Sequence, residues 1–351
     1  ELGTFMNYLS HIQTRLSASR VARAQLQLYV FYWLLSLFLI LMESTAMAST
    51  PVASPSPAWR AMTAPGFSLH AVWGRNERSV FAVGESGTIQ HFDGQAWKPM
   101  DSGTSSSLFG IWGLPGGALF AVGSQGTVLK GDGKTWKLLN LPFKERFYGV
   151  WGTSEQDLFV VGYNGTILHF NGTRWELQAG QPGAGDKGSG GPWMGAVWGT
   201  SGRNVYAVGT RGTILHFDGR RWLPMDSGTQ NNLWAVWGAG PDQVFAAGES
   251  GTLLRYDGRR WAAMDSGTDQ MLSGLWGRSG QEVYAIGNRT ILRFDGARWQ
   301  AMEGHDGRIL TGIWGSPDAA TLYAVAMRGI VLRYGNEPAP LLPITTRASL
   351  Y

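Results

Sequence analysis

The sequence predicts an all-β fold, and three observations support this prediction. Of the 351 residues, 50 are Gly and 17 are Trp, whereas only 15% are charged. Gly is a poor helix former and Trp only a moderate one, and an aromatic content of 12% is not typical of disordered chains. The dipeptide Trp-Gly also recurs at a nearly constant spacing, and each interval contains four short apolar segments separated by Gly-rich turns. These features indicate repeated small antiparallel sheets.

The repeat itself specifies the architecture. Trp-Gly begins at seven positions, which are Trp73, Trp112, Trp151, Trp198, Trp237, Trp276 and Trp314. Each unit continues with an apolar segment such as 80–84, a Gly-Thr turn, a second segment such as 213–217, an Asp-Gly turn and a second Trp. A unit of about 40 residues with four strands is typical of one blade of a β-propeller. The sequence therefore predicts a seven-bladed β-propeller of four-stranded blades over residues 58–335.

The second Trp series predicts how the ring closes. It has only six members after the first Trp-Gly, namely Trp97, Trp136, Trp175, Trp222, Trp261 and Trp299. The missing copy lies at the other end of the repeat region, where 58–62 (AWRAM) resembles 260–264 (RWAAM). We therefore expect an N-terminal strand around Trp59 to complete the last blade, which leaves no large unpaired edge.

The repeated residues have structural explanations. The two series account for 14 of the 17 Trp, and a buried Trp removes about 150–250 Å² from water, so we predict core positions rather than aromatic binding sites. A small residue two positions before each first Trp fits a crowded innermost strand. Five Asp-Gly pairs recur between the last two segments of the repeat units, at Asp93, Asp132, Asp218, Asp257 and Asp295, and Asn171-Gly172 takes their place in one unit. These pairs are predicted to form tight hairpins, because both positions tolerate positive φ. They are not expected to be catalytic carboxylates.

The N-terminal segment has the features of an export signal. Arg15, Arg20 and Arg23 precede an apolar run over 28–42, and 46–48 reads Ala-Met-Ala. We expect residues 1–48 to be a signal peptide cleaved after Ala48, with a retained membrane anchor as the alternative. A Pro- and Ser-rich linker over 49–57 and a C-terminal tail over 336–351 complete the predicted organisation. The expected location is outside the cytoplasm.

The pattern VWG…VFAVG…GTIxHFDGxxW resembles that of bacterial exported β-propeller repeat proteins, over about residues 58–334. A weaker similarity links 132–136 (DGKTW) to Asp-box propellers, the repeat type of sialidases and of the photosystem II assembly factor of thylakoids. The resemblance implies a seven-bladed fold and a role in binding or scaffolding. It implies no shared reaction.

Signs of chemistry are few. The absence of Cys excludes disulfides, thiol catalysis and thiolate metal sites. His91, His169 and His216 share one repeat position, so they are expected to lie a blade apart and not to converge on a metal. The net charge of +4 comes from interspersed charges, which argues against a nucleic-acid partner. We therefore expect no catalytic centre, cofactor or metal site.

Candidate binding residues are those at which the repeats differ. One set occupies the loops between the second and third strands of the blades: Glu85, Gln125, Tyr163, Asn164, Arg211, Glu249, Arg289 and Arg328. A Gly-rich insertion over 180–192, with Asp186, Lys187 and the following Trp193, is expected on the same rim. A second set, three positions before the first Trp of each blade, is expected to face either the central channel or a neighbouring blade; it includes His70, Phe109, Tyr148 and Trp234.

The sequence thus predicts an exported binding or scaffold propeller with a protein partner, acting as a subunit or assembly factor of a membrane or envelope complex. The alternative is a carbohydrate-active enzyme or lectin with a glycan in the central channel. A membrane contact is expected only if 28–42 is retained.

Overall fold

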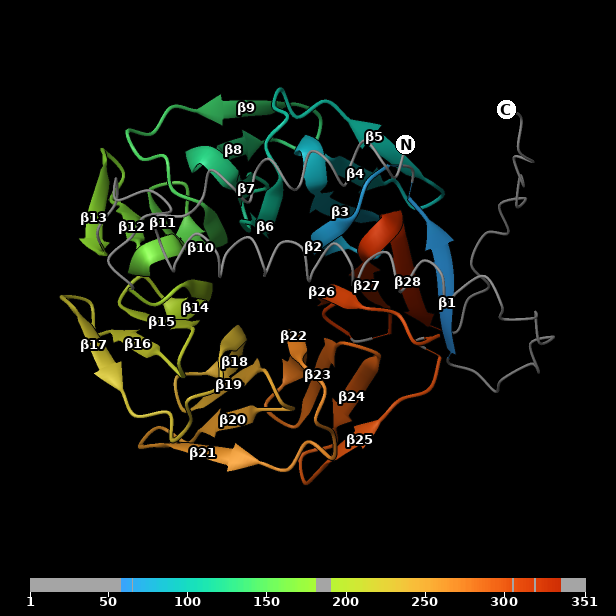
Figure 1. Ribbon diagram of the computed structural model, residues 1–351. Helices are drawn as coiled ribbons and strands as arrows, with labels where there is room; N and C mark the ends of the chain where they lie inside the picture. The colour runs from blue at the N-terminus through green and yellow to red at the C-terminus, as the bar shows by residue number, and fades with distance from the viewer. Residues whose placement is uncertain (1–57, 65, 181–190, 305, 319, 336–351) are drawn as a thin grey trace, which may run out of the picture. The chain divides into compact units, whose positions relative to one another are not determined.

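The computed structural model describes residues 58–335 except 65, 181–190, 305 and 319. The sequence predictions on 1–57 and 336–351, and those on Asp186 and Lys187, lie outside the described residues. Within the described part, seven antiparallel four-stranded sheets form a ring (Figure 1). This confirms the predicted seven-bladed β-propeller. The strands of each blade are called A to D from the axis outwards.

The strands are short and follow the predicted order. Blades one to four comprise β2 (Leu69–Asn76), β3 (Ser79–Gly84), β4 (Ile89–Phe92) and β5 (Trp97–Met100); β6 (Leu108–Gly113), β7 (Leu119–Gly123), β8 (Val128–Gly131) and β9 (Trp136–Leu139); β10 (Phe147–Ser154), β11 (Asp157–Gly162), β12 (Ile167–Phe170) and β13 (Trp175–Ala179); β14 (Met194–Ser201), β15 (Asn204–Gly209), β16 (Ile214–Phe217) and β17 (Trp222–Met225). Blades five and six comprise β18 (Leu233–Gly240), β19 (Gln243–Gly248), β20 (Leu253–Tyr256) and β21 (Trp261–Met264); β22 (Leu272–Ser279), β23 (Glu282–Gly287), β24 (Thr290–Phe294) and β25 (Trp299–Ala301).

Blade seven joins the two ends of the repeat region. It contains β26 (Leu310–Gly315), β27 (Leu322–Ala326), β28 (Ile330–Gly335) and, as its outer strand, β1 (Ala58–Thr63). The β1–β28 ladder runs antiparallel from Ala58↔Gly335 to Thr63↔Ile330. Figure 1 shows β1 beside β28, at the meeting point of the blue and red ends of the colour scale. The prediction of ring closure by the strand around Trp59 is therefore confirmed.

The Trp-Gly pairs link each blade to the next one. At six of the seven interfaces the ring of a strand-A Trp lies so close to the Gly of the following blade that an added Cβ would overlap it, as for Trp151 on Gly199 and Trp237 on Gly277. Trp112 instead donates a hydrogen bond from Nε1 to the carbonyl of Gly152, at 3.0 Å. Between blades six and seven, the ring of Trp276 again lies against Gly315. In six repeats the indole of the preceding blade therefore occupies the space that a side chain would need after Trp. At Gly152 that space is limited instead by the carbonyl of Asp157 and the side chain of Leu158.

The last blade makes the same contact with the first. The ring of Trp314 would lie 2.6 Å from a Cβ at Gly74. The hydroxyl of Thr311 donates to the carbonyl of Leu69 at 2.8 Å, and the hydroxyl of Tyr323 donates to the carbonyl of Glu77 at 2.8 Å. Blades seven and one are therefore held together by the same packing as the other neighbours, with hydrogen bonds in addition.

The Asp-Gly turns differ from the prediction in their mechanism. Each turn spans four residues, and only the Gly has positive φ, for example 93° at Gly94. The Asp side chain instead accepts hydrogen bonds from two backbone N–H groups; Oδ1 of Asp93 accepts from Gln95 and Ala96, both at 2.9 Å. The equivalent backbone bonds hold the pKa values of Asp218, Asp257 and Asp295 below the ordinary range. The pairs are turns, as predicted, but the Asp acts through its carboxylate.

Strand B of every blade places one aromatic side chain in the core, and in five blades a strand-C His or Arg lies over its ring. His91 stacks on Phe81 with 4.3 Å between ring centroids, and His169 stacks on Phe159 at 4.2 Å. In blade five an Arg takes this position, with the guanidinium of Arg255 5.6 Å from the ring of Phe245. These His residues therefore belong to separate aromatic stacks, and the described residues contain no cluster that could hold a metal ion.

The core Tyr residues predict loss of stability in alkali. Burial raises the pKa of Tyr206 from 10.0 to about 12. Because the unfolded chain releases this proton at lower pH, we expect the free energy of unfolding to fall as pH rises from 10 towards 12. Denaturant unfolding at several pH values would measure this fall, and Tyr206→Phe should make it shallower. An equal fall in the two proteins would contradict the assignment.

Candidate functional site

One end of the propeller, here called the B–C rim, is formed by the loops between strands B and C together with the loops that enter strand A. In six blades the first N–H of the B–C loop donates to the carbonyl just before strand A of the same blade, as from Glu85 to Ser68 at 2.9 Å. Further bonds reach the next blade, as from the N–H of Gly126 to the carbonyl of Glu145 at 2.7 Å. These bonds place the B–C loops and the segments that enter strand A at one end of the ring. Residues 181–190 of the insertion lie outside the described residues.

The B–C loops present one non-Gly residue of positive φ in each blade. These residues are Ser86, Gln125, Asn164, Arg211, Ser250, Arg289 and Arg328, with φ between 52° and 65°. The left-handed conformation costs a non-Gly residue about 1–2 kcal/mol. The strain recurs in all seven blades, so it belongs to the turn itself. Six of the seven side chains are exposed to solvent on the rim.

The central channel opens in the middle of the B–C rim, and its lining contains the second candidate set. His70, Phe109, Tyr148 and Trp234 all line a channel cavity of about 230 Å³. His70 and Phe109 have ring centroids 5.1 Å apart, and Phe109 and Tyr148 have centroids 5.5 Å apart. Burial lowers the pKa of His70 despite the nearby charge of Glu85. Blades one to three therefore present an aromatic arc at the channel mouth.

The aromatic arc continues outwards over blades three and four. The guanidinium of Arg146 lies 5.9 Å from the ring of Phe109, and the carbonyl of Arg146 accepts the N–H of Tyr163 at 2.9 Å. Tyr163 contacts Trp193 with 5.2 Å between centroids. Trp193 is 41% exposed, and its backbone N–H donates a hydrogen bond to the hydroxyl of Thr210.

Two exposed apolar residues extend this surface at the opposite side of the ring. Phe67 is 57% exposed in the segment before β2, and Met327 is 46% exposed in the B–C loop of blade seven. The N–H of the adjacent Arg328 donates to the hydroxyl of Ser68 at 3.3 Å, which places the two segments together. The sequence prediction placed Met327 in the B–C loop of the last blade, but it missed Phe67 and Arg146. Phe67 could have been found as an apolar residue in a segment whose counterparts in other blades are mostly polar.

Asn164 does not fit its predicted role as a contact residue. Its side chain is only 5% exposed, so a partner on the rim could not reach it. The other predicted rim residues in the described part, namely Glu85, Gln125, Tyr163, Trp193, Arg211, Glu249, Arg289 and Arg328, are exposed or partly exposed. They surround the whole rim and do not gather at one point.

The channel lacks the carboxylates expected for glycan chemistry. Its lining consists of strand-A residues of the seven blades, all within the described part, and includes no Asp or Glu. The aromatic platform expected for a glycan site is present in part, because Trp193 is exposed, but a pair of acidic groups beside it is not. The arrangement favours contact with apolar and aromatic groups over acid–base catalysis.

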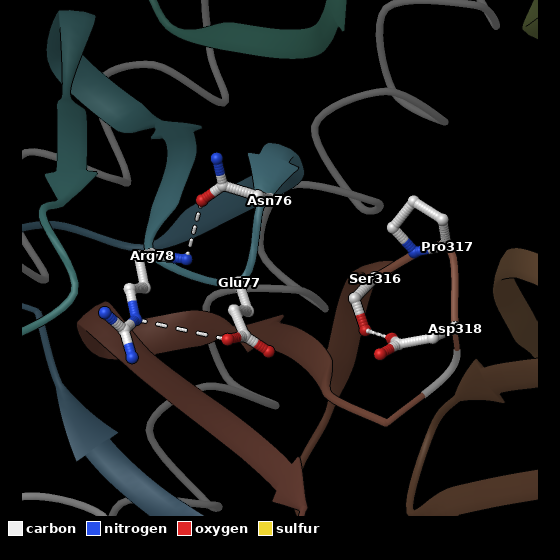
Figure 2. A pocket seen from close by; sticks show the side chains of 6 residues that line it. All are labelled: Asn76, Glu77, Arg78, Ser316, Pro317 and Asp318. Carbon is white, nitrogen blue, oxygen red and sulfur yellow. Dashed lines mark hydrogen bonds and ion pairs between the residues drawn. The ribbon is translucent and has the colours of Figure 1, made fainter.

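A separate pocket of about 560 Å³ lies at the opposite end of the ring, between blades seven and one (Figure 2). Its polar groups interact within their own loops. Oδ1 of Asn76 accepts from the N–H of Arg78 at 2.9 Å, and the hydroxyl of Ser316 donates to Asp318 at 2.5 Å. Figure 2 shows these two groups on separate loops that face each other across the pocket. We assign no function to this pocket.

Comparisons with known proteins support the fold. No family model matches the sequence, and no curated protein matches it. Among solved structures, the protein is similar to YCF48, a photosystem II assembly factor, bound to a D1 peptide, with 17% identity and a TM-score of 0.64 over 82% of this chain and 100% of that one. YCF48 from Cyanidioschyzon merolae gives 17% identity and 0.64 over 79% and 99%.

WD40 propellers are similar to about the same degree. The RRP9 WD40 repeats give 10% identity and a TM-score of 0.64 over 80% and 99% of the two chains, and U3-55K gives 11% and 0.66 over 80% and 100%. These values show the propeller fold, which agrees with the weaker of the two resemblances noted in the sequence.

Among the described residues, no helix is long and apolar enough to cross a membrane.

Proposed function

We propose that this propeller is a non-catalytic protein-interaction scaffold that binds its partner on the B–C rim. The observation that carries the proposal is the exposed surface of Trp193, Tyr163, Arg146, Phe67 and Met327 around the aromatic channel mouth. Trp, Tyr and Arg are the residue types that contribute most at protein interfaces. Similar propellers support the proposal, since one of them is seen with a bound peptide.

The rim is suited to rigid recognition. Backbone N–H groups fix the loops that bear these residues: Tyr163 donates to the carbonyl of Arg146, Thr210 to the carbonyl of Trp193, and Arg328 to the hydroxyl of Ser68. Little conformational entropy is therefore lost when a partner binds, which favours affinity. The partner that fits this surface presents apolar or aromatic groups to the channel mouth.

The test compares two sets of exposed apolar residues. Replacing Phe67, Trp193 and Met327 by Ser should reduce capture of the native partner at least tenfold. The control replaces Leu138 and Leu177 by Ser; they are 43% and 42% exposed on the outer strands β9 and β13. Capture with tagged protein, quantified by mass spectrometry, should be unchanged in the control. Equal capture by all three proteins, or equal loss in both variants, would overturn the assignment to the rim.

We also propose that the protein is exported and acts as a subunit or assembly factor of an envelope complex. The support is the basic, apolar and Ala-Met-Ala sequence of residues 1–48. N-terminal sequencing of the protein recovered from its native cells tests this proposal. A start at Ser49 is expected, and a retained apolar segment would instead indicate a membrane anchor.

A further inference from the structure

Blade two departs from the aromatic packing of the other six blades. In those blades strand C ends in an aromatic residue that packs on the strand-D Trp, with centroids 5.3–5.5 Å apart. In four of them it also contacts the strand-B aromatic of the preceding blade. Blade two has Gly131 at this position, and Trp136 lies where the missing side chain would be, 2.8 Å from an added Cβ.

A cation takes part of the vacated space. The guanidinium of Arg75 lies 5.8 Å from the ring of Phe81, the face that a strand-C aromatic of blade two would cover. It donates to the carbonyl of Asp132 at 2.9 Å and to that of Gly117. Beside Trp136 there is thus a charged group, Arg75, which is fixed to the backbone and exposed to solvent.

Two recesses flank the outer strands of blade two and share Lys130, Lys137 and Glu155. The first, of about 610 Å³, also contains Arg75, Gly117 and Thr135. The second, of about 430 Å³, has an apolar wall that includes Phe120, Leu139, Leu158, Phe170 and Trp175. Together they form the blade-two hollow, and each recess is within the usual size of a small-molecule site.

The charges around the hollow are not balanced. Lys130 and Lys137 lie directly opposite each other in the β8–β9 ladder, an arrangement that is unfavourable for like charges. Lys130 is paired with Glu155 at 2.7 Å. The carboxylate of Asp132 is held by the N–H groups of its own turn. Within the described part of the chain Lys137 has no ion pair, so a positive charge remains unmatched beside an apolar wall.

We propose that the blade-two hollow binds a small organic acid with an apolar body. Its carboxylate would lie at Lys137 and Arg75, and its ring or alkyl chain would pack against Phe120, Phe170 and Trp175. An anion relieves the repulsion between the two Lys, and the apolar body is removed from water. The hollow lies at the end of the propeller opposite the B–C rim, so this binding is independent of the partner proposed there.

The chain contains a matched control for the charge. Lys98 occupies the same repeat position in blade one as Lys137 does in blade two, but it is paired with Asp93 at 2.5 Å beside an intact Phe92–Trp97 pair. Lys137→Gln should therefore weaken binding and Lys98→Gln should not. Lys137→Arg should restore most of the affinity, because it keeps the charge.

The experiment uses 3-phenylpropanoate, its uncharged amide and acetate as probes of the full chain, measured by calorimetry and tryptophan fluorescence. We expect saturable binding of 3-phenylpropanoate, about tenfold weaker binding of the amide and of acetate, and a similar tenfold loss in Lys137→Gln. Three results would overturn the proposal: no saturable binding at millimolar concentration, equal binding of acid and amide, or equal losses in the Lys137 and Lys98 variants. Unfolding curves of each variant exclude a general loss of structure.

Discussion

Replacing Trp59 by Ala is expected to lower the free energy of unfolding by about 3–5 kcal/mol. Trp59 is 8% exposed and packs on Tyr334 with 5.3 Å between ring centroids. Its removal leaves a cavity in the outer part of blade seven. This loss is a large share of the 5–15 kcal/mol that typically stabilises a domain. Denaturant unfolding followed by tryptophan fluorescence would measure it.

Trp299→Ala provides the matched control, because Trp299 is also 8% exposed and packs on Phe294 at 5.3 Å. We expect the two variants to lose similar stability but to differ in local opening. Strand β25 is joined through a short turn to β24, whereas β1 is held to β28 only by its ladder and packing. Amide exchange in β28 should therefore quicken in Trp59→Ala alone. Equal exchange in both variants would contradict the role of Trp59 in holding the closing strand.

Trp314→Ala is expected to have an effect of similar size, about 3–5 kcal/mol. Trp314 is 8% exposed and lies on Gly74 of blade one, so its loss weakens the contact between the last and first blades. Gly74→Val should also destabilise, by about 1–3 kcal/mol, because the new side chain would overlap the indole. Thermal and denaturant unfolding of both variants would measure these changes.

The control for overpacking is Gly116→Ala, at a position with open space around the added Cβ. It should change stability by less than about 0.5 kcal/mol. A Gly74 variant as stable as this control would show that Trp314 can move aside without cost. It would then refute the explanation given for Gly in the Trp-Gly repeat.

Much of the fold could be predicted because both the regular features of the repeat and its one displaced copy are visible in the sequence. Seven Trp-Gly pairs fix the number of blades, and the displaced copy around Trp59 fixes the closure. The core positions could also be predicted, since Phe81 and Tyr206 occupy equivalent positions of the repeat. A periodic pattern of this kind identifies which residues are equivalent, and equivalence indicates burial.

The candidate site could be predicted only in outline. The loops with unequal residues were identified, but their orientation depends on contacts between segments far apart in sequence, such as Arg146 with Phe109. Asn164 was misassigned because the equivalent residues of the other six blades are exposed. Only in its own blade do the surrounding residues bury this side chain. The role of Asp in the turns was misjudged because Asp-Gly is compatible with two different turn geometries. The sequence analysis did not single out Gly131, and its consequence follows only from the positions of Trp136 and Arg75.

Closure by β1 also has a consequence for the order of synthesis. Strand β1 leaves the ribosome before any other strand of the propeller, yet its partner β28 is made some 270 residues later, as the register of Ala61 with Leu332 shows. Until β28 has been made, β1 has no pairing partner, and the indole of Trp59 and the backbone of β1 stay exposed. Pairing at such separation is slow and leaves the chain open to aggregation. We therefore expect a chaperone, if the chain needs one, to bind mainly the first strand and the last blade before they pair.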